Sequence, residues 1–243
     1  MDGTNQWIET TNQTGCRLYI VLDTPTAPQT QPWKGVLDIA CDVAWGRSDA
    51  SGAMYALWED FKWVGTYDTV LGGSRYLPGT SFLLTTWLTR YPDCGTVNCH
   101  DMGGAIAIFA NALGCGASCT EVAPFGYLNC IKPIGCGWAN NPFYDYPGVC
   151  PDPIMPGNST MDSQGRPRTL FSSHAFATSS DGVIYDASGV YVDGDWDPDD
   201  WPCLRGLGLC QYNWDDYRPK VIDDNPAPPY GTGSPSLVTF SVQ

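Results

Sequence analysis

Apolar residues recur at helical spacing in four segments of the chain, all within its first half. In each segment the apolar side chains stand three or four positions apart, as expected for a helix that buries one face. The clearest start signal belongs to the last segment, where Asn98 occupies the N-cap position and Asp101 follows three residues later. The pattern therefore predicts helices over residues 32–44, 50–64, 80–89 and 98–113.

Runs of β-branched and aromatic residues predict strands before, between and after these helices. The runs cover residues 18–22, 120–131, 171–178 and 182–187, and residues 66–76 are expected to form a strand or a hairpin. Ser179-Ser180-Asp181-Gly182 joins the last two runs and has the composition of a β-hairpin turn. Because helices come first and an antiparallel sheet follows, the predicted fold class is α+β.

Two segments lack hydrophobic periodicity. Residues 132–169 are rich in Gly, Pro and Asn, and so long a loop in a compact domain is usually functional or cross-linked. Residues 219–243 carry five prolines, which predicts an extended C-terminal arm over the surface. We expect the whole chain, residues 1–243, to form one domain with its core at roughly residues 33–190.

Charge excludes two classes of partner. The formal net charge is −14, from 26 acidic and 12 basic residues, so the chain offers no basic footprint for nucleic acid or for an anionic membrane surface. No apolar run approaches the ~18 residues that a membrane-spanning helix needs. A protein or peptide substrate is compatible with this charge.

Eleven cysteines are an unusually high number for a protein of a reducing compartment. They predict a disulfide framework of five bridges with one free thiol, and hence a secreted or extracytoplasmic location. The first residues have neither the basic start nor the apolar core of a signal peptide, so this chain does not show the route of export. The alternative is a structural zinc site, although the close Cys-x-x-Cys pairs of such sites are absent from Cys115, Cys119, Cys130 and Cys136.

Cys99 is the position where a free thiol has a chemical use. It stands in the first turn of the predicted helix 98–113, where the helix dipole and the free N–H groups favour a thiolate. The chain has only two histidines. His100 is the next residue along the helix and points about 100° away, so we expect His174 to be the base. Asp186 on the neighbouring strand would orient the imidazole.

Each of these residues also has a structural interpretation. Cys99 is expected in a disulfide with Cys94 or Cys115 if it is not a nucleophile. His174 would then be a hydrogen-bonded core residue, and Asp186 a turn residue. The chain order of nucleophile, base and acid, together with the odd number of cysteines, favours the catalytic interpretation.

Residues 98–114 resemble the nucleophile helix of the transglutaminase-like superfamily. His174-Ala175-Phe176 and Tyr185-Asp186-Ala187-Ser188 are similar to the His-Ala-Trp and Asp-Pro-Thr segments of that superfamily. The resemblance covers roughly residues 80–190 and implies a papain/transglutaminase-like fold, with Cys99 as nucleophile, His174 as base and Asp186 as orienting acid. Phe176 in place of Trp and Ala187 in place of Pro are mild departures, whereas the cysteine-rich insertion at 115–170 is a larger one.

The activity implied by the resemblance is cysteine-dependent acyl transfer on peptide or amide bonds. We expect hydrolysis, with protein-glutamine γ-glutamyltransferase crosslinking as the alternative, and a non-catalytic, disulfide-stapled binding module as the non-enzymatic one. In transglutaminases an upstream Trp supplies the second oxyanion donor, for which Trp63 is the first candidate, followed by Trp58 and Trp87.

No cofactor is expected, but one acidic segment has to be weighed. Residues 193–200 alternate carboxylates as the start of a calcium loop does. The twelfth position of such a loop would be Leu204 instead of an acidic residue. A solvated acidic turn is therefore favoured over a calcium site.

Overall fold

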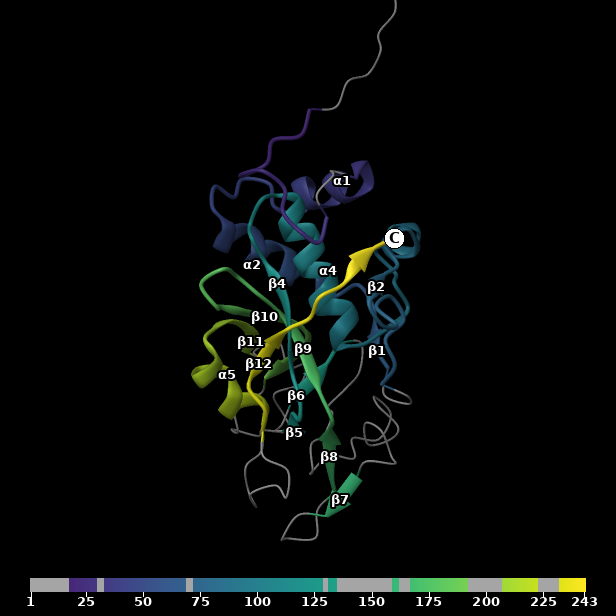
Figure 1. The fold of residues 1–243 in the computed structure, drawn as a ribbon, viewed down its shortest axis with the longest axis vertical. Coiled ribbons are helices and arrows are strands. Elements are labelled where there is room, and N and C mark those ends of the chain that lie inside the picture. Colours follow the sequence, from purple (N-terminus) through teal and green to yellow (C-terminus); the bar gives the residue numbers. More distant parts are fainter. Residues whose placement is uncertain are drawn as a thin grey trace, which may run out of the picture.

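The computed structural model describes residues 18–29, 33–68, 72–128, 131–134, 159–161, 167–191, 207–222 and 232–243. These residues form helices and several sheets, of which the main one is antiparallel, and this confirms the α+β class (Figure 1). One hydrophobic cluster joins buried side chains from Val36 to Phe240. The helical and sheet segments therefore share a core.

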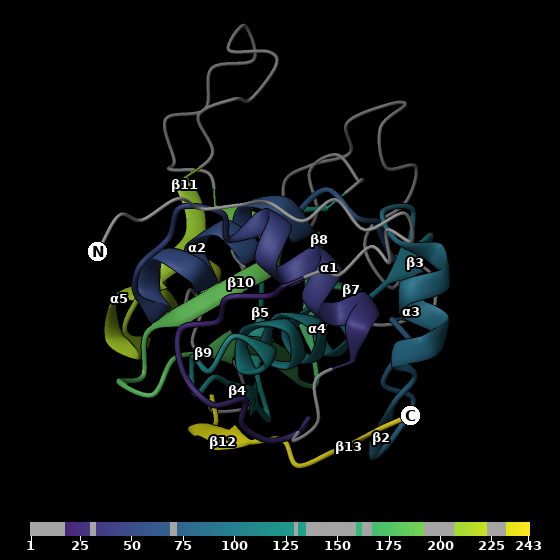
Figure 2. The same cartoon turned by 90° about the horizontal axis from the view of Figure 1, so that it is seen from above.

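Helix α4 (Cys99–Ala112) lies at the centre of the described structure. Helices α1 (Lys34–Val43) and α2 (Ala50–Phe61) pack on one side of it, and the sheet packs on the other (Figure 2). Nearly every residue of α4 is buried, which is the pattern of a helix covered on all sides. The predicted helix 98–113 is thus confirmed, as are the helices predicted at 32–44 and 50–64.

The main sheet contains the two strands that the predicted hairpin turn connects. Its strand order is β11-β10-β9-β4-β12, with β6 also pairing with β10, and all of these pairs are antiparallel. The turn at residues 179–182 joins β9 to β10 as predicted. The strands are β4 (Ser118–Val122), β6 (Ile131–Pro133), β9 (His174–Thr178), β10 (Ile184–Tyr191), β11 (Leu207–Tyr212) and β12 (Pro235–Leu237).

Short elements complete the frame around α4. Strand β1 (Thr66–Tyr67) pairs in parallel with β3 (Thr96–Val97), directly before α4. Two further short sheets join distant segments of the chain. The remaining elements are β2 (Ser81–Phe82), α3 (Leu84–Arg90), β5 (Gly126–Tyr127), β7 (Ser159–Met161), β8 (Pro167–Phe171), α5 (Trp214–Val221) and β13 (Ser241–Val242).

The carboxylate of Asp101 anchors the start of α4. It accepts hydrogen bonds from the backbone N–H groups of residues 75–77 and of Asn98, and from the Ser74 hydroxyl. Asn98 in turn accepts from the Asp101 N–H at 3.1 Å, which completes a capping box. The first turn of α4 is therefore fixed to the loop that precedes α3.

The structure corrects five of the predicted elements. The helix predicted at 80–89 begins only at Leu84, and Ser81–Phe82 form β2 instead. Of the segment 66–76, only Thr66–Tyr67 form a strand among the described residues. Residues 18–22 form no strand; the N–H groups of Leu22 and Asp23 instead bond to the carbonyl of Leu113 at the end of α4. The predicted strand 120–131 is divided among β4, β5 and β6, because Pro124 has no N–H to donate. The predicted loop 132–169 contains β7 and the start of β8.

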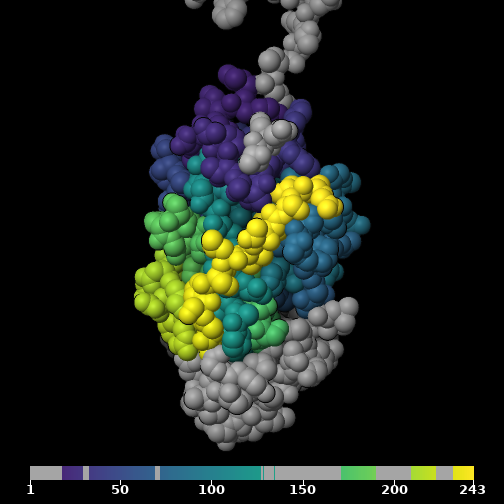
Figure 3. Space-filling view, in the orientation of Figure 1, coloured from purple at the N-terminus to yellow at the C-terminus, as the bar shows by residue number. Residues whose placement is uncertain are grey.

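The C-terminal arm is extended only in part. Helix α5 reaches Val221, so the arm begins later than predicted. Residues 232–243 cross the face of the molecule from the edge of the sheet to α3, which is the diagonal ribbon of atoms in Figure 3. Strands β12 and β13 attach them to β4 and β2. The arm therefore covers an edge of the main sheet, which protects unpaired backbone groups.

The predicted framework of five disulfides is wrong. Six cysteines have free thiols, and the other five lie outside the described residues, so at most two bridges can form. The free ones are Cys41, Cys94, Cys99, Cys115, Cys119 and Cys210. The secreted location, which rested on that framework, stays a prediction.

The metal sites weighed from the sequence fall wholly or partly outside the described residues. The acidic segment 193–200 lies outside them, as do Cys130 and Cys136. Within the described part of the chain, no three His, Cys, Asp or Glu side chains gather as a metal site would require. Among the same residues, no helix combines the length and apolar character needed to cross a membrane.

Candidate active site

Cys99 is the first residue of α4 and has a free thiol. Its side chain is almost completely buried, with 4% of the residue exposed. Strand β3 leads directly into it, and Asn98 between them caps the helix. The sequence predicted this position, and the capping box explains why the chain starts a helix there.

His174 and Asp186 lie on the neighbouring strands β9 and β10 and contact each other. The His174 Nε2 and the Asp186 Oδ2 are 2.9 Å apart, and both side chains are at least 98% buried. The charge and hydrogen bond of His174, with further hydrogen bonds, outweigh burial and lower the pKa of Asp186. Asp186 is therefore a carboxylate that holds His174 by one nitrogen.

Three other residues donate hydrogen bonds to Asp186, and none of them was predicted from the sequence to have this role. The Tyr217 hydroxyl donates to its Oδ2 at 2.7 Å, and the Ser188 N–H donates to its Oδ1 at 2.8 Å. The Trp58 indole N–H donates to its backbone carbonyl at 2.8 Å. Tyr217 lies on α5, so a residue 31 positions after Asp186 in the chain contributes to the site.

The second nitrogen of His174 is available to Cys99. His174 Nδ1 is buried and has no hydrogen-bond partner among the described residues. Burial would lower the pKa of His174, but the charges of Asp186 and Cys99 raise it to about 10. His174 is therefore an imidazolium whose free N–H lies on the side of the thiol.

The thiol of Cys99 is strongly acidic. Burial would raise its pKa, yet the charge of His174, together with the hydrogen bond and charge of His100, lowers it to about 5. The pKa of other described thiols shifts in the opposite direction: burial raises the pKa of Cys94 and of the partly buried Cys210 to about 12. Among the described cysteines with a shifted pKa, Cys99 alone is thus a thiolate near neutral pH.

The exclusion of His100 on angular grounds was wrong. His100 Nδ1 lies 3.6 Å from the Cys99 Sγ, and its Nε2 lies 3.0 Å from the Glu121 Oε1. Neighbouring side chains on a helix leave the axis about 100° apart, but the imidazole is long enough to turn back. Glu121 on β4 holds the far nitrogen and so directs the near one towards the sulfur.

Tyr67 is a further residue that the sequence analysis missed. The pairing of β1 with β3 sets Tyr67 opposite Val97, two residues before Cys99. Burial raises the pKa of Tyr67 well above its ordinary value. The charge of Cys99 and a hydrogen bond to the Cys99 side chain raise this pKa further, whereas a hydrogen bond to the Cys99 backbone lowers it. The Tyr67 hydroxyl therefore lies beside both the thiol and the backbone N–H of Cys99.

The tryptophans considered as oxyanion donors lie elsewhere. Trp63 is 74% exposed and its ring lies beneath the Lys62 ammonium, so it does not line the buried site. The Trp58 N–H is committed to Asp186, and Trp87 packs among aromatic rings of the core. Tyr67 lies on β1, which pairs with the short strand β3 before α4, so its position in the sequence gave no signal of this role.

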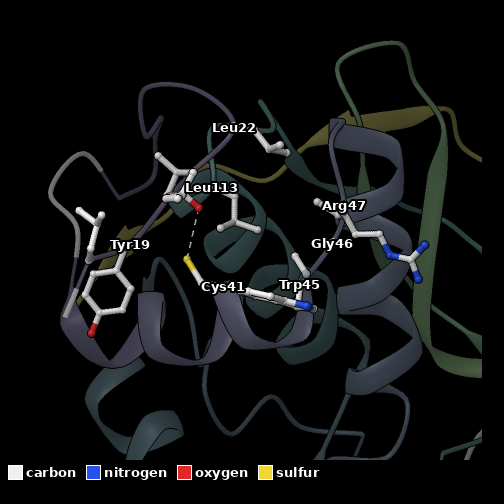
Figure 4. A pocket seen from close by; sticks show the side chains of 12 residues that line it. Tyr19, Leu22, Cys41, Trp45, Gly46, Arg47 and Leu113 are labelled. Carbon is white, nitrogen blue, oxygen red and sulfur yellow. Dashed lines mark hydrogen bonds between the residues drawn. The ribbon is translucent and has the colours of Figure 1, made fainter. Parts of the chain in front are cut away.

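A separate cavity of about 410 Å³ lies between the N-terminal segment and α1 (Figure 4). Its lining is mostly apolar, with Arg47 at one end and Cys41 donating to the Ile20 carbonyl at 3.8 Å. Cys99, His174 and Asp186 do not line it. It is therefore distinct from the candidate active site.

Comparison with known proteins does not extend this description. No protein-family model, curated protein or solved structure matches the chain. The functional argument therefore depends on the geometry around Cys99.

Proposed function

We propose that this protein is a cysteine-dependent hydrolase of peptide or amide bonds, with Cys99, His174 and Asp186 as its catalytic triad. The observation that carries the proposal is the buried pair His174–Asp186, 2.9 Å apart, whose free Nδ1 faces the thiolate of Cys99. A structural histidine would be expected to satisfy both nitrogens when it is this deeply buried. The free thiol of Cys99 supports catalysis over a role in a disulfide.

The proposal includes a papain/transglutaminase-like fold. Three features support it: a nucleophile at the first residue of a central helix, an antiparallel sheet packed against that helix, and base and acid on neighbouring strands. The segments that resemble the transglutaminase-like superfamily are the ones that carry Cys99, His174 and Asp186. The same acyl-transfer chemistry recurs on unrelated folds, so the site carries the functional argument and the fold is secondary to it.

In the proposed first step the Cys99 thiolate attacks the carbonyl carbon of the substrate. The C–N bond then breaks, the His174 imidazolium gives its Nδ1 proton to the leaving amine, and a thioester remains on Cys99. Asp186 keeps the imidazole in the required tautomer and stabilises its charged form. The hydrogen bonds from Tyr217 and Ser188 hold Asp186 in place during this exchange.

We assign the oxyanion site to the Cys99 backbone N–H and the Tyr67 hydroxyl. Both donors lie beside the sulfur, where the carbonyl oxygen of a bound substrate would develop its charge. The N–H of Cys99 belongs to the first turn of α4 and has no partner within the helix. This assignment gives Tyr67 the role that was expected of an upstream Trp.

In the second step water or an amine cleaves the thioester. Water gives hydrolysis, whereas a lysine amine gives a crosslink, and the triad is common to both outcomes. We favour hydrolysis, as expected from the sequence. The proposal also includes a location outside the cytoplasm and a reaction that needs no resident cofactor.

The test is acyl-enzyme formation with p-nitrophenyl acetate, an activated ester that requires no specific recognition. We expect a burst of nitrophenolate and an acetyl group on Cys99 in the intact mass spectrum. Cys99→Ala should lose both, whereas the matched control Cys41→Ala should retain both. A Cys99→Ala protein that still shows the burst would refute the proposal.

Two further assays separate the outcomes of the second step. Labelled casein cleaved into soluble peptides would indicate hydrolysis. Dansylcadaverine incorporated into the same casein, without cleavage, would indicate γ-glutamyl transfer. In each assay the Cys99→Ala variant measures the background.

A further inference from the structure

Cys99 lies between two histidine–carboxylate pairs. His174 pairs with Asp186 at 2.9 Å, and His100 pairs with Glu121 at 3.0 Å. His100 Nδ1 is 3.6 Å from the Cys99 Sγ. A cysteine nucleophile needs one imidazole to become a thiolate, so the second pair is beyond what the triad requires.

The two pairs differ in their access to solvent. The side chains of His174 and Asp186 are 2% and 1% exposed, whereas those of His100 and Glu121 are 22% and 30% exposed. Tyr217 also holds the inner pair by a hydrogen bond to Asp186, and the charge of His174 acts on the thiol. The outer pair can exchange protons with water, and its imidazole still reaches the sulfur.

We propose that His100 is the general base that activates water in the second step, with Glu121 as its positioning residue. The inference rests on the proposed function and deepens it, because it divides the reaction between the two imidazoles. His174 serves formation of the thioester, and His100 serves its hydrolysis.

The electrostatic logic of this division follows from the charge on sulfur. In the resting enzyme the thiolate and Glu121 both favour the imidazolium form of His100, and they raise its pKa to about 9 against the opposing effect of burial. A thioester carries no charge, so acylation removes one of these two supports. His100 then releases a proton to solvent and becomes the neutral imidazole that a base must be.

The proposed step balances in atoms and protons. His100 Nδ1 takes a proton from a water molecule as the water oxygen bonds to the carbonyl carbon. The C–S bond breaks, its electron pair returns to Cys99 as thiolate, and the new imidazolium of His100 pairs with that thiolate again. The proton of the carboxylic acid product restores the His174 imidazolium.

Burst kinetics with p-nitrophenyl acetate test the inference, using His100→Gln and Glu121→Gln. We expect His100→Gln to retain a full burst, while its steady-state rate falls by about 100-fold or more, the usual contribution of a general base. Acetylated Cys99 should accumulate in its intact mass spectrum. Glu121→Gln should show the same pattern with a loss of about 10-fold, as for other residues that orient a histidine.

Hydroxylamine supplies a second readout that a structural role would not change. It attacks thioesters without needing a base, so it should restore turnover in His100→Gln much more than in the native protein. Glu59→Gln is the matched control, because Glu59 forms a surface ion pair with Lys62 at 2.8 Å. The control should retain the native burst and steady-state rate.

Three results would overturn the inference. In the first, the burst and the steady-state rate fall together in His100→Gln although its thermal unfolding is unchanged, which would place His100 in acylation. In the second, neither rate changes. In the third, the native protein forms no acyl group on Cys99, which would remove the proposed function as well; the first two results leave that function intact.

Discussion

Gly103 of α4 lies directly against the backbone of Phe176 on β9. A Cβ atom at position 103 would be 3.0 Å from the carbonyl carbon of Phe176 and 3.1 Å from its Cα. Because glycine has no side chain, the helix that carries Cys99 and the strand that carries His174 approach each other more closely here than any other residue would allow. This contact limits how far apart the proposed nucleophile and its proposed base can lie.

Gly103→Ala should push α4 away from β9. We expect a loss of about 1–3 kcal/mol in the free energy of unfolding, as for other overpacked cores, together with slower acylation of Cys99. Chemical denaturation and the nitrophenyl acetate burst measure the two effects. Gly52→Ala on α2 is the control, because its Cβ would meet only side-chain atoms of Asp49 and Arg47. That control should be neutral or gain up to about 1 kcal/mol from helix propensity; equal losses in both variants would contradict the argument.

The Cys99 thiol should react at a pH where ordinary thiols do not. Its pKa of about 5 means that the thiolate fraction rises through that pH and is nearly complete at neutral pH. A free cysteine, with a pKa of about 8.5, is almost fully protonated at about pH 6. We expect iodoacetamide at this pH to modify Cys99 first, as mapped by peptide mass spectrometry.

His174→Ala should reverse this behaviour. Without the imidazolium, burial dominates and the pKa of Cys99 rises, so its alkylation at about pH 6 should slow by at least 10-fold. The measurement is the full pH profile of the alkylation rate. An unchanged profile would show that His174 does not interact with the thiol.

Tyr67→Phe should impair acylation while leaving the fold intact. It removes the hydroxyl beside Cys99 and keeps the ring that stacks on Phe171. Loss of one oxyanion donor typically lowers the rate by about 100- to 1000-fold, and we expect the burst rate to fall by that order. Tyr185→Phe is the matched control, since its hydroxyl contacts Ser51 at 3.2 Å instead of the site. A native burst rate in Tyr67→Phe would exclude the hydroxyl from the oxyanion site.

Tyr217→Phe should weaken both stability and the triad. The hydroxyl donates to the buried Asp186 carboxylate at 2.7 Å, and a hydrogen bond to a charged group contributes about 1.5–3 kcal/mol. We expect a stability loss of that order and a lower burst rate, because Asp186 gains freedom to turn. If thermal unfolding shifts but the burst rate does not, Tyr217 supports only the fold.

Asp101→Asn should loosen the loop before α3 from the start of α4. An amide cannot accept all the hydrogen bonds that the carboxylate receives from residues 74–77 and Asn98. We expect a loss of about 2–4 kcal/mol, since buried donors are left without partners. Thermal unfolding measures it, and Asp49→Asn, at the exposed N-cap of α2, is a control that should cost less than about 1 kcal/mol.

Local signals were sufficient where a segment forms its own hydrogen bonds. The helix at 98–113 follows from the capping box of Asn98 and Asp101, and the β9–β10 hairpin follows from its turn. Residues 18–22 have the composition of a strand but pair with no strand of the described residues, and the N–H of Leu22 bonds to the end of α4 instead. Strand composition predicts a pairing surface and not the partner, which only the packing supplies.

The candidate site divides in the same way. Chain order and helix position identified Cys99, His174 and Asp186, because each is marked by its own element. The contributions of Tyr67 and Tyr217 arise from strand pairing and helix packing between segments far apart in the chain. Sequence spacing carries no information on such contacts until the register of the sheet is known.

The sequence by itself identified Cys99 as the candidate nucleophile, since the first turn of a capped helix supplies free N–H groups and a favourable dipole whatever surrounds it. Only the tertiary structure decided that this thiol has two imidazole neighbours. The direction of its Cβ predicted that His100 would point away from the sulfur. Glu121, 21 residues away on β4, instead binds its Nε2 and brings its Nδ1 to the sulfur. A side-chain torsion is set by its hydrogen-bond partner, and that partner is chosen by the packing of the helix on the sheet.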